Sequence, residues 1–317
     1  MTAPFAIEAF DRARAGDIGA LARSITLIEN ETEGFEHIMR AVHLAAKSAN
    51  VIGFTGPPGA GKSSLISAVI RELRGRGRTV AIVAVDPSSP ITGGAILGDR
   101  IRMVEHVSDA GVFARSLGSR GHLGGVSRTT RRIVELMRCT PFDVVIVETV
   151  GTGQSEVEIT TIADVKLVVN APGLGDDIQA IKAGILEIAD IMIVNKSDLP
   201  AAASTVRHLQ MMLALRSTNR DVPVLATSAL QATGIGELVD ALQAALEARA
   251  TAADDRTAKV RQTIADQVAH EIRTRLRSCE NAEIDAICEA FITGEIGFSG
   301  VTDAVLRALA PNDKATS

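Results

Sequence analysis

The first 48 residues carry apolar side chains at the three- and four-residue spacing of amphipathic helices. In a helix this spacing places the apolar side chains on one face, which packs against other elements. The clearest stripe consists of Ile18, Leu21, Ile25 and Ile28. Residues 4–48 are therefore predicted to be helical, and residues 1–49 to form an N-terminal helical extension.

From residue 50 the pattern changes to short runs of apolar, largely β-branched residues, each bounded by Gly, Pro or Asp. Six strands are predicted, at residues 51–55, 80–85, 142–148, 165–170, 191–195 and 222–227. Helical stretches separate most of these runs. Strands that alternate with helices are typical of a mainly parallel sheet with helices on both faces. The predicted fold class is therefore α/β, a fold that binds ligands at the carboxyl ends of its strands.

The C-terminal part returns to helical spacing. Residues 249–258 are polar and small, which predicts a linker or a helix start. Beyond them, apolar residues at steps of four predict a long amphipathic helix; they are Val260, Ile264, Val268, Ile272 and Leu276. Shorter helices are predicted near 282–292 and 299–310. Two further domains are therefore expected, at 50–250 and 251–317.

Composition narrows the class of protein. Hydrophobic residues make up 46% of the chain and aromatic residues only 3%, so a sizeable core must be built from aliphatic side chains. The formal net charge of -5 disfavours nucleic acid as a partner. Three cysteines without a CxxC pair argue against a disulfide framework. No secretory signal and no apolar run of about 18 residues is found, so a cytoplasmic protein without a membrane span is expected.

Residues 56–63, GPPGAGKS, match the phosphate-binding pattern GxxxxGK[ST] between a predicted strand and a predicted helix. The glycines let the backbone N–H groups surround phosphates, and the helix N-terminus adds positive potential. Lys62 is expected to reach the β- and γ-phosphates and the Ser63 hydroxyl to bind Mg²⁺. The predicted contacts are Gly56, Pro57, Pro58, Gly59, Ala60, Gly61, Lys62, Ser63 and Ser64.

Two later loops favour guanine over adenine. NKSD at 195–198 has the NKxD form, and TSAL at 227–230 resembles the [TS]SA loop of guanine-binding proteins. The Asp198 carboxylate can accept two N–H bonds from guanine, whereas adenine would leave it unpaired. GTP and GDP are therefore the predicted ligands. The predicted base contacts are Asn195, Lys196, Asp198, Ser228, Ala229 and Leu230.

Acidic residues end two of the predicted strands, at Asp86 and Glu148. Glu148 begins the sequence ETVG, which has the form ExxG at a place where GTPases usually carry DxxG. A carboxylate there holds Mg²⁺ directly or through water, and the Gly151 N–H can bond the γ-phosphate. Asp99, in a Gly-rich segment, is a further candidate, with a helix-start role as an equal alternative. The predicted Mg²⁺ ligands are Ser63, Asp86, Asp99 and Glu148.

The residue after Gly151 is Thr152, where many small GTPases carry a water-orienting Gln, although Gln154 is close. Slow hydrolysis by the isolated protein is therefore expected, with stimulation by a partner or by dimerisation. The predicted catalytic residues are Lys62, Asp99, Glu148, Gly151 and Gln154.

Several segments together resemble the MeaB/ArgK family of P-loop GTPases: DPSSP, GDRIRM, SRGHLGG, VETVGTGQSE, APGLGDDIQAIKAGI and NKSDLP. These are G-proteins associated with adenosylcobalamin-dependent acyl-CoA mutases, chiefly methylmalonyl-CoA mutase. The resemblance covers nearly the whole chain, and ExxG is itself a feature of the group. It implies a P-loop NTPase fold with a SIMIBI-type G domain, flanked by the two helical extensions.

The resemblance also implies a chaperone function, in which GTP gates the loading of adenosylcobalamin onto the mutase and the release of inactive cofactor. It implies a homodimer joined through the C-terminal arm, residues 251–317. A further segment of the family matches residues 173–182. There Asp176, Gln179 and Lys182 are candidate switch or partner residues, although on the residues alone this is a Gly-rich helix start.

Two alternative functions make other demands on the sequence. A metallochaperone GTPase of related fold would carry a His-rich tail or a Cys-Pro-Cys site, and the sequence has neither. An ATP-dependent kinase of the arginine/ornithine transport type would need an adenine site, which the guanine loops argue against. The client stays open among methylmalonyl-, ethylmalonyl-, isobutyryl- and hydroxyisobutyryl-CoA mutases.

Overall fold

The computed structural model describes most of the chain. The described residues are 3–86, 104–106, 108–118, 127–149, 159–173, 183–215, 221–251, 261, 264–265, 268–269, 272–273, 275–276 and 282–309. The chain divides into two compact units, Met1–Ala252 and Ala253–Ser317. Each unit is described by itself below.

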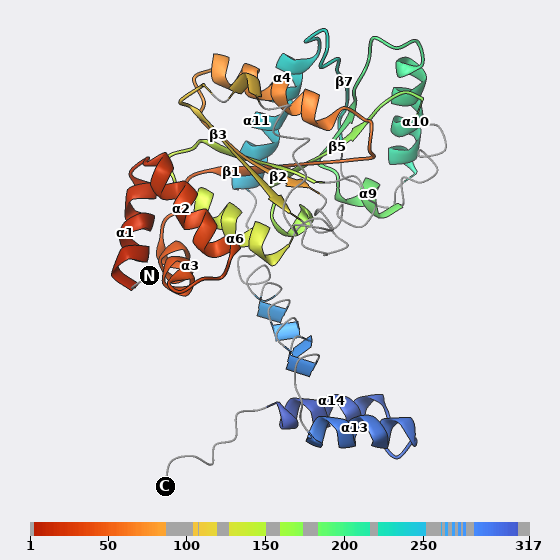
Figure 1. Ribbon diagram of the computed structural model, residues 1–317. Helices are drawn as coiled ribbons and strands as arrows, with labels where there is room; N and C mark the ends of the chain where they lie inside the picture. The colour runs from red at the N-terminus through yellow and green to blue at the C-terminus, as the bar shows by residue number, and fades with distance from the viewer. Residues whose placement is uncertain are drawn as a thin grey trace. The chain divides into compact units, whose positions relative to one another are not determined.

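The described residues of the first unit form a seven-stranded parallel sheet in the order β3-β2-β4-β1-β5-β6-β7 (Figure 1). The strands are β1 (Asn50–Thr55), β2 (Val80–Asp86), β3 (Val112–Gly118), β4 (Val144–Glu148), β5 (Val165–Asn170), β6 (Ile191–Val194) and β7 (Val224–Ala226). Since β1 lies between β4 and β5, the loop after β1 emerges between the carboxyl ends of two neighbours. The predicted α/β P-loop fold is confirmed.

One strand was missed by the sequence pattern. The six predicted strands are present, with β7 shorter than expected, but β3 is a seventh. It lies at the edge of the sheet and pairs only with β2. Because an edge strand is partly exposed, its sequence VFARSLG is interrupted by Arg115 and Ser116 and lacks the continuous apolar run of a central strand.

Helices connect the strands and cover the sheet. In the first unit they are α1 (Ala3–Arg14), α2 (Ile18–Glu29), α3 (Phe35–Leu44), α4 (Lys62–Gly75), α6 (Arg128–Met137), α9 (Ala183–Ile188), α10 (Ala202–Ala214) and α11 (Ile235–Thr251), with the short 3₁₀ helices η1 (Val104–His106) and η2 (Ile159–Thr161). Because α11 continues through Thr251, the start of the expected polar linker at 249–258 is helical.

Alternate residues of each strand point to opposite faces of the sheet, and both faces are buried. On one face, Ile52 and Phe54 of β1 share a core with α4 and α11. On the other face, Val51 and Val145 pack in a core with α2, α3 and α6, while α10 covers the β6 end. This double cover holds β1 rigidly, and with it the loop that follows.

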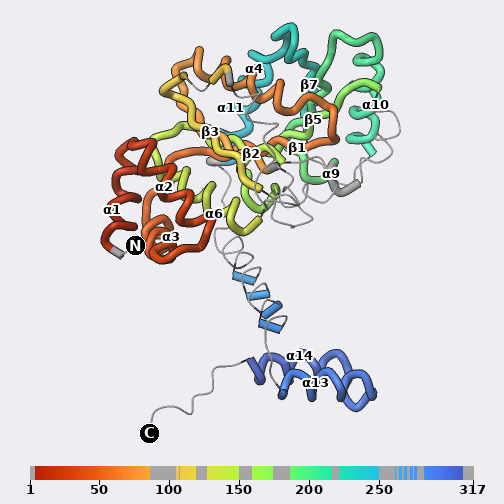
Figure 2. Tube along the Cα trace, in the orientation of Figure 1, coloured from red at the N-terminus to blue at the C-terminus, as the bar shows by residue number. Residues whose placement is uncertain are grey.

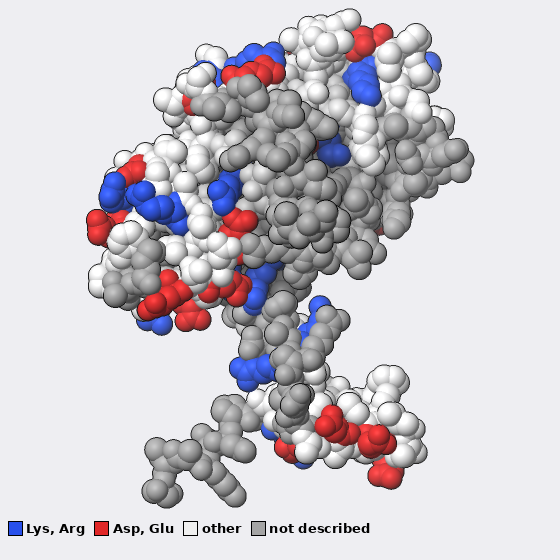
Figure 3. Space-filling model, in the orientation of Figure 1, with Lys and Arg blue, Asp and Glu red and all other residues white. Residues whose placement is uncertain are grey.

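The three N-terminal helices form their own layer beside α6 (Figure 2), as the helical pattern predicted. Glu31, in the turn after α2, accepts hydrogen bonds from Arg132 (2.7 Å) and Arg128 (3.2 Å) of α6. Arg115 of β3 reaches Glu29 at 2.5 Å. On the face drawn in Figure 3, acidic and basic side chains are interspersed over these helices.

The second unit contains α13 (Ala282–Ile292) and α14 (Phe298–Ala308), close to the predicted helices. Phe291 and Phe298 meet edge to face with ring centroids 5.0 Å apart. Of the predicted stripe at 260–276, Ile264 and Val268 lie in helical residues and are 57% and 50% exposed, and Val260 lies outside the described residues. Among the described residues, no helix has the length and apolar content needed to cross a bilayer.

Candidate functional site

The loop between β1 and α4 can be built only with glycine at two positions. Gly56 has φ of 139°, and a Cβ there would lie 2.1 Å from the Val169 carbonyl oxygen of β5. Gly61 has φ of 82°, and a Cβ there would lie 2.5 Å from the Asn195 side-chain nitrogen. The glycines therefore let the loop turn tightly against two neighbouring strand ends.

Lys62 begins α4 and is only 9% exposed. Its ammonium group donates to the Gly56 carbonyl at 2.8 Å and to the Pro57 carbonyl at 3.1 Å. The charge is thus held inside the curve of the loop, at the N-terminus of a helix of 14 residues. A positive side chain and helix N–H groups that converge on one point form a site for anions.

The loop after β6 docks on this phosphate loop. The Asn195 amide donates to the carbonyls of Ala60 (2.9 Å) and Gly61 (3.3 Å), and its oxygen accepts from the Ala229 N–H (3.2 Å). Lys196, with φ of 58°, donates to the Gly59 carbonyl at 2.7 Å. Residues from the ends of β1, β6 and β7, far apart in sequence, are therefore joined by side-chain hydrogen bonds.

Asp198 lies exposed beside this junction. The fully buried Ser228 donates from its hydroxyl to one Asp198 carboxylate oxygen at 2.5 Å, and the same hydroxyl accepts from the Gln231 N–H at 3.3 Å. The carboxylate is thus oriented by a fixed hydroxyl while its solvent side stays open to a ligand. Leu230 is 91% exposed, so its side chain contributes little to the fixed part of the loop.

A buried polar pair lies at the end of β4. The Ser63 hydroxyl donates to a Glu148 carboxylate oxygen at 2.7 Å, and each residue is 5% exposed. The next residue, Thr149, bonds to Thr55 at the end of β1 (3.1 Å). This pair brings together two predicted Mg²⁺ ligands of the sequence analysis, and hydroxyl and carboxylate oxygens are donors that Mg²⁺ accepts.

Other predicted residues are less fully described. Asp86 ends β2 in register with Gly118, but its side chain is not described. The predicted residues outside the described part of the chain are Asp99, Gly151, Gln154, Asp176, Gln179 and Lys182. Pro57, Pro58 and Ser64 lie in or directly after the loop, with Pro58 and Ser64 exposed.

Sequence reasoning missed two residues close to the site. Ser67, one turn after Ser63 on α4, lies 2.8 Å from the His106 Nε2 of η1, and both are buried. A serine inside a helix and an isolated histidine 39 residues later have no common motif. Only the folded chain brings them together.

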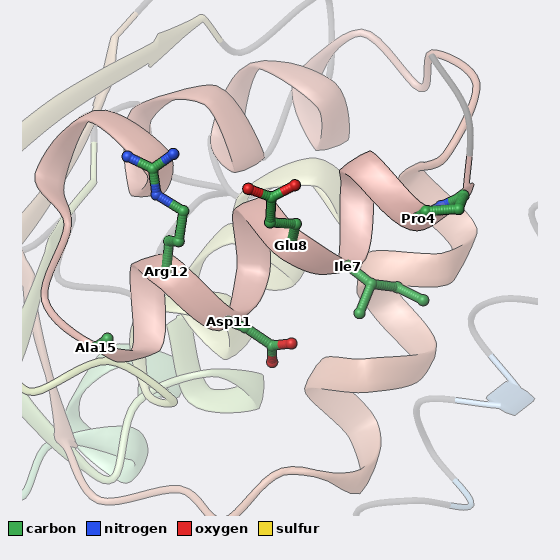
Figure 4. A pocket seen from close by; sticks show the side chains of 6 residues that line it. All are labelled: Pro4, Ile7, Glu8, Asp11, Arg12 and Ala15. Atoms are coloured by element: carbon green, nitrogen blue, oxygen red, sulfur yellow. The ribbon is translucent and has the colours of Figure 1, made fainter.

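An open hollow runs along α1, outside the predicted site (Figure 4). Its lining residues are Pro4, Ile7, Glu8, Asp11, Arg12 and Ala15. They lie along one side of the helix, and the Arg12 guanidinium is already paired with Asp17 (3.0 Å from Nε). All six residues belong to α1 or follow it directly, so the hollow includes no residue of the loops after β1, β4 and β6.

A glycine-rich loop after the central strand of a parallel sheet, with an NKxD loop docked on it, defines a P-loop GTPase. The model of the family described as "Methylmalonyl Co-A mutase-associated GTPase MeaB" matches residues 21–283. The chain therefore belongs to the MeaB family, which binds guanine nucleotide and hydrolyses GTP.

Individual relatives agree. A putative GTPase of Pyrococcus abyssi is 41% identical over 284 residues, which is 88% of this chain and 86% of the relative. The GTPase ArgK of Escherichia coli is 38% identical over 74% of each chain. The crystal structure of an LAO/AO transport system kinase superposes with a TM-score of 0.72 at 26% identity, covering 97% of this chain and 98% of its own.

Proposed function

We propose that the protein is a Mg²⁺-dependent GTPase that serves as chaperone to an adenosylcobalamin-dependent acyl-CoA mutase. GTP would gate the loading and release of the cofactor and so protect the mutase. Methylmalonyl-CoA mutase, or a close relative of it, is the proposed client. The observation that carries this proposal is the match of residues 21–283 to a family described by its association with that mutase.

The phosphate contacts follow from the geometry of the loop. The backbone N–H groups of the loop residues other than Pro57 and Pro58 surround the phosphates, and Lys62 exchanges the carbonyls of Gly56 and Pro57 for phosphate oxygens. Because an ammonium bonds more strongly to an anionic oxygen than to a neutral carbonyl, this exchange favours the bound nucleotide.

The base contacts follow from the docked loops. Asp198, oriented by Ser228, accepts the two N–H bonds that guanine offers. The Lys196 ammonium bonds to the Gly59 carbonyl of the phosphate loop, and its stem can cover the base. The backbone N–H groups near Ala229 are the proposed partners of the guanine oxygen, with Leu230 beside them.

We assign the Mg²⁺ site to Ser63 and Glu148, together with Asp86 and Asp99. The paired oxygens of Ser63 and Glu148 fit a hard cation, which supports the assignment. Bound Mg²⁺ neutralises charge on the β- and γ-phosphate oxygens. The protein's own contribution is to keep a carboxylate and a hydroxyl together where water is excluded.

Hydrolysis is proposed to be slow without a partner. Thr152 follows Gly151 in the sequence, where many small GTPases carry a water-orienting Gln, and Gln154 is close by in the sequence. Asp176, Gln179 and Lys182 are proposed as the residues that respond to nucleotide or partner. These assignments rest on the family resemblance, and they give the client a route to accelerate GTP hydrolysis.

The second unit, residues 251–317 in the proposed domain division, is assigned to dimerisation. Phe298 is 83% exposed, Ile292 is 76% exposed, and α14 has no buried residue. A helix pair with so small a core gains stability when a second copy covers its apolar side chains. This exposure supports a homodimer joined through the arm.

The test is GTP hydrolysis by the purified protein with and without purified methylmalonyl-CoA mutase and its relatives. The client is expected to bind the protein and to raise the hydrolysis rate by about tenfold or more. Lys62→Ala is the matched control, and it is expected to abolish hydrolysis in both conditions. If no mutase binds or alters the rate, the chaperone proposal is wrong while the GTPase assignment stands.

A further inference from the structure

Three side-chain contacts join one side of α4 to η1 and to Asp109, which follows it. They recur at about one helical turn each, and Arg74 makes a bidentate contact. The contacts are Ser67 Oγ with His106 Nε2 (2.8 Å), Arg71 Nη2 with Glu105 Oε2 (3.2 Å), and Arg74 Nε and Nη2 with the two Asp109 oxygens (2.8 and 2.9 Å). Glu105, His106 and Asp109 are therefore held along the helix that begins with the phosphate loop.

The three contacts differ in how strongly they hold. The Arg71–Glu105 pair is more than half exposed on both sides, and such pairs contribute little. Ser67 and His106 are 3% and 6% exposed, so a lost partner would leave a buried polar group unsatisfied. Of the two contacts made by η1 itself, the Ser67–His106 hydrogen bond is therefore the stronger, and the bidentate Arg74–Asp109 pair holds the chain three residues further on.

This contact lies one turn from the proposed Mg²⁺ ligands. Ser63 and Ser67 are four residues apart on α4, so they share a face of the helix. Ser63 bonds to Glu148 at 2.7 Å, and Ser67 bonds to His106. One face of the helix thus holds the end of β4 in its first turn and the end of the β2–η1 connection in its second.

The β2–η1 connection starts at Asp86 and reaches η1 at Val104. Asp99, a proposed Mg²⁺ ligand, belongs to this connection in the sequence. At one end the backbone of β2 is fixed by pairing with β3 and β4. At the other end it is His106 that attaches the chain to the phosphate-binding helix.

We propose that Ser67 and His106 are positioning residues for GTP hydrolysis. Their hydrogen bond holds the end of the β2–η1 connection at a constant place relative to Ser63 and Glu148. A serine hydroxyl can donate to Nε2 or accept from an N–H there, so the contact forms with either imidazole tautomer. The inference rests on the proposed Mg²⁺ site and is independent of which mutase is the client.

The test compares single-turnover GTP hydrolysis at saturating Mg²⁺ in full-length variants. His106→Ala and Ser67→Ala are each expected to slow hydrolysis about three- to tenfold, with GDP affinity in EDTA within about twofold of the starting protein. The double variant is expected to be no slower than either single variant, since both lose the same bond. His106→Gln, which keeps a polar nitrogen near the Nε2 position, is expected to recover most of the rate.

Glu105→Gln is the matched control, because it removes only the exposed contact and is expected to leave the rate unchanged. Rates of His106→Ala and Ser67→Ala close to the unsubstituted protein would overturn the positioning role. So would losses that multiply in the double variant, or a His106→Gln protein as slow as His106→Ala. An unsubstituted protein whose hydrolysis ignores Mg²⁺ would instead remove the proposed Mg²⁺ site and this inference together.

Discussion

At the residue scale, Gly56 is the most constrained position of the phosphate loop. Any side chain there must enter the space of the Val169 carbonyl, at a backbone angle that L-residues rarely adopt. Gly56→Ala is therefore expected to weaken GDP binding by more than about tenfold, because the loop must move away from β5. Titration calorimetry with GDP measures this effect.

Gly75 provides the matched control for Gly56→Ala. It lies in the last turn of α4, and a Cβ there meets nothing within 4 Å. Gly75→Ala is expected to leave GDP affinity unchanged and to raise helix stability slightly. Equal GDP affinities for the two variants would contradict the steric argument.

In the proposed site, Asp198 selects guanine over other purine bases. Asp198→Asn replaces an acceptor of two N–H bonds by a group that accepts one and donates one. GDP affinity is expected to fall more than about 100-fold, while xanthosine diphosphate, which offers the matching N–H and C=O pair, gains affinity. Competition calorimetry with the two diphosphates and ADP measures the preference.

Ser228→Ala tests how much the orientation of the Asp198 carboxylate contributes to binding, because the carboxylate itself is retained. It removes one hydrogen bond to Asp198 and leaves the carboxylate, so GDP affinity is expected to fall by less than about tenfold with guanine still preferred. If the Asp198→Asn variant still preferred guanine, the assignment of Asp198 as the residue that selects the base would be wrong.

Residue types at fixed spacing predicted these loops because the phosphate and base motifs are local in sequence. The side-chain contacts between these loops could not be predicted from the sequence. Asn195 bonds to Ala60, 135 residues earlier, and Ser67 meets His106 across 39 residues. Neither separation is set by a motif, since each depends on how the sheet orders its strands.

At the scale of elements, the central strands were predicted and the edge strand was not. β4 reads VVIVE because both of its faces are buried, which leaves a continuous apolar run. β3 needs apolar residues mainly where it touches β2, and its Arg115 instead pairs with Glu29 of α2. An edge strand with a polar partner has no distinctive pattern, so periodicity alone misses it.

Asp143, just before β4, fastens the start of β2. Its carboxylate accepts from the Thr79 N–H (2.7 Å) and from the Thr79 hydroxyl (2.8 Å). The backbone hydrogen bond of Thr79 holds the pKa of Asp143 below its ordinary value of 3.8. The charged form is therefore stabilised by folding, and its contribution is present above that value and lost as the pH falls through and below it.

The expected result is a free energy of unfolding that declines as the pH falls from about 5 to about 3, with a shallower decline in Asp143→Asn. Urea titrations at a series of pH values measure both slopes. Other paired carboxyls, such as Asp109 beside Arg74, contribute to the decline in both proteins because this pairing lowers the pKa of Asp109. Identical slopes would show that Asp143 does not contribute.

At the scale of the whole molecule, the proposed dimer depends on the apolar side chains of the second unit. Ile292→Asp places a charge where a partner copy would bury an isoleucine, and it is expected to shift the protein toward monomer. Sedimentation velocity over a range of concentrations measures the change. Glu295→Gln, at an exposed position between α13 and α14, is the control and is expected to remain dimeric.

A starting protein that sediments as a monomer at all concentrations would reject the dimer, and an Ile292→Asp dimer would place the interface elsewhere. The sequence predicts a linker or helix start at residues 249–258 because they are polar and small. Residues 249–251 belong to the end of α11, since such residues also fit the last turn of a helix.

The hydrogen bonds from Asn195 and Lys196 to the backbone of Ala60, Gly61 and Gly59 make one loop serve two purposes. In the proposed site, recognition of the purine and binding of the phosphates depend on the same hydrogen bonds, so neither can be redesigned alone. An engineer who replaced Asn195 to accept another base would also loosen the protein's hold on every triphosphate, whatever its base.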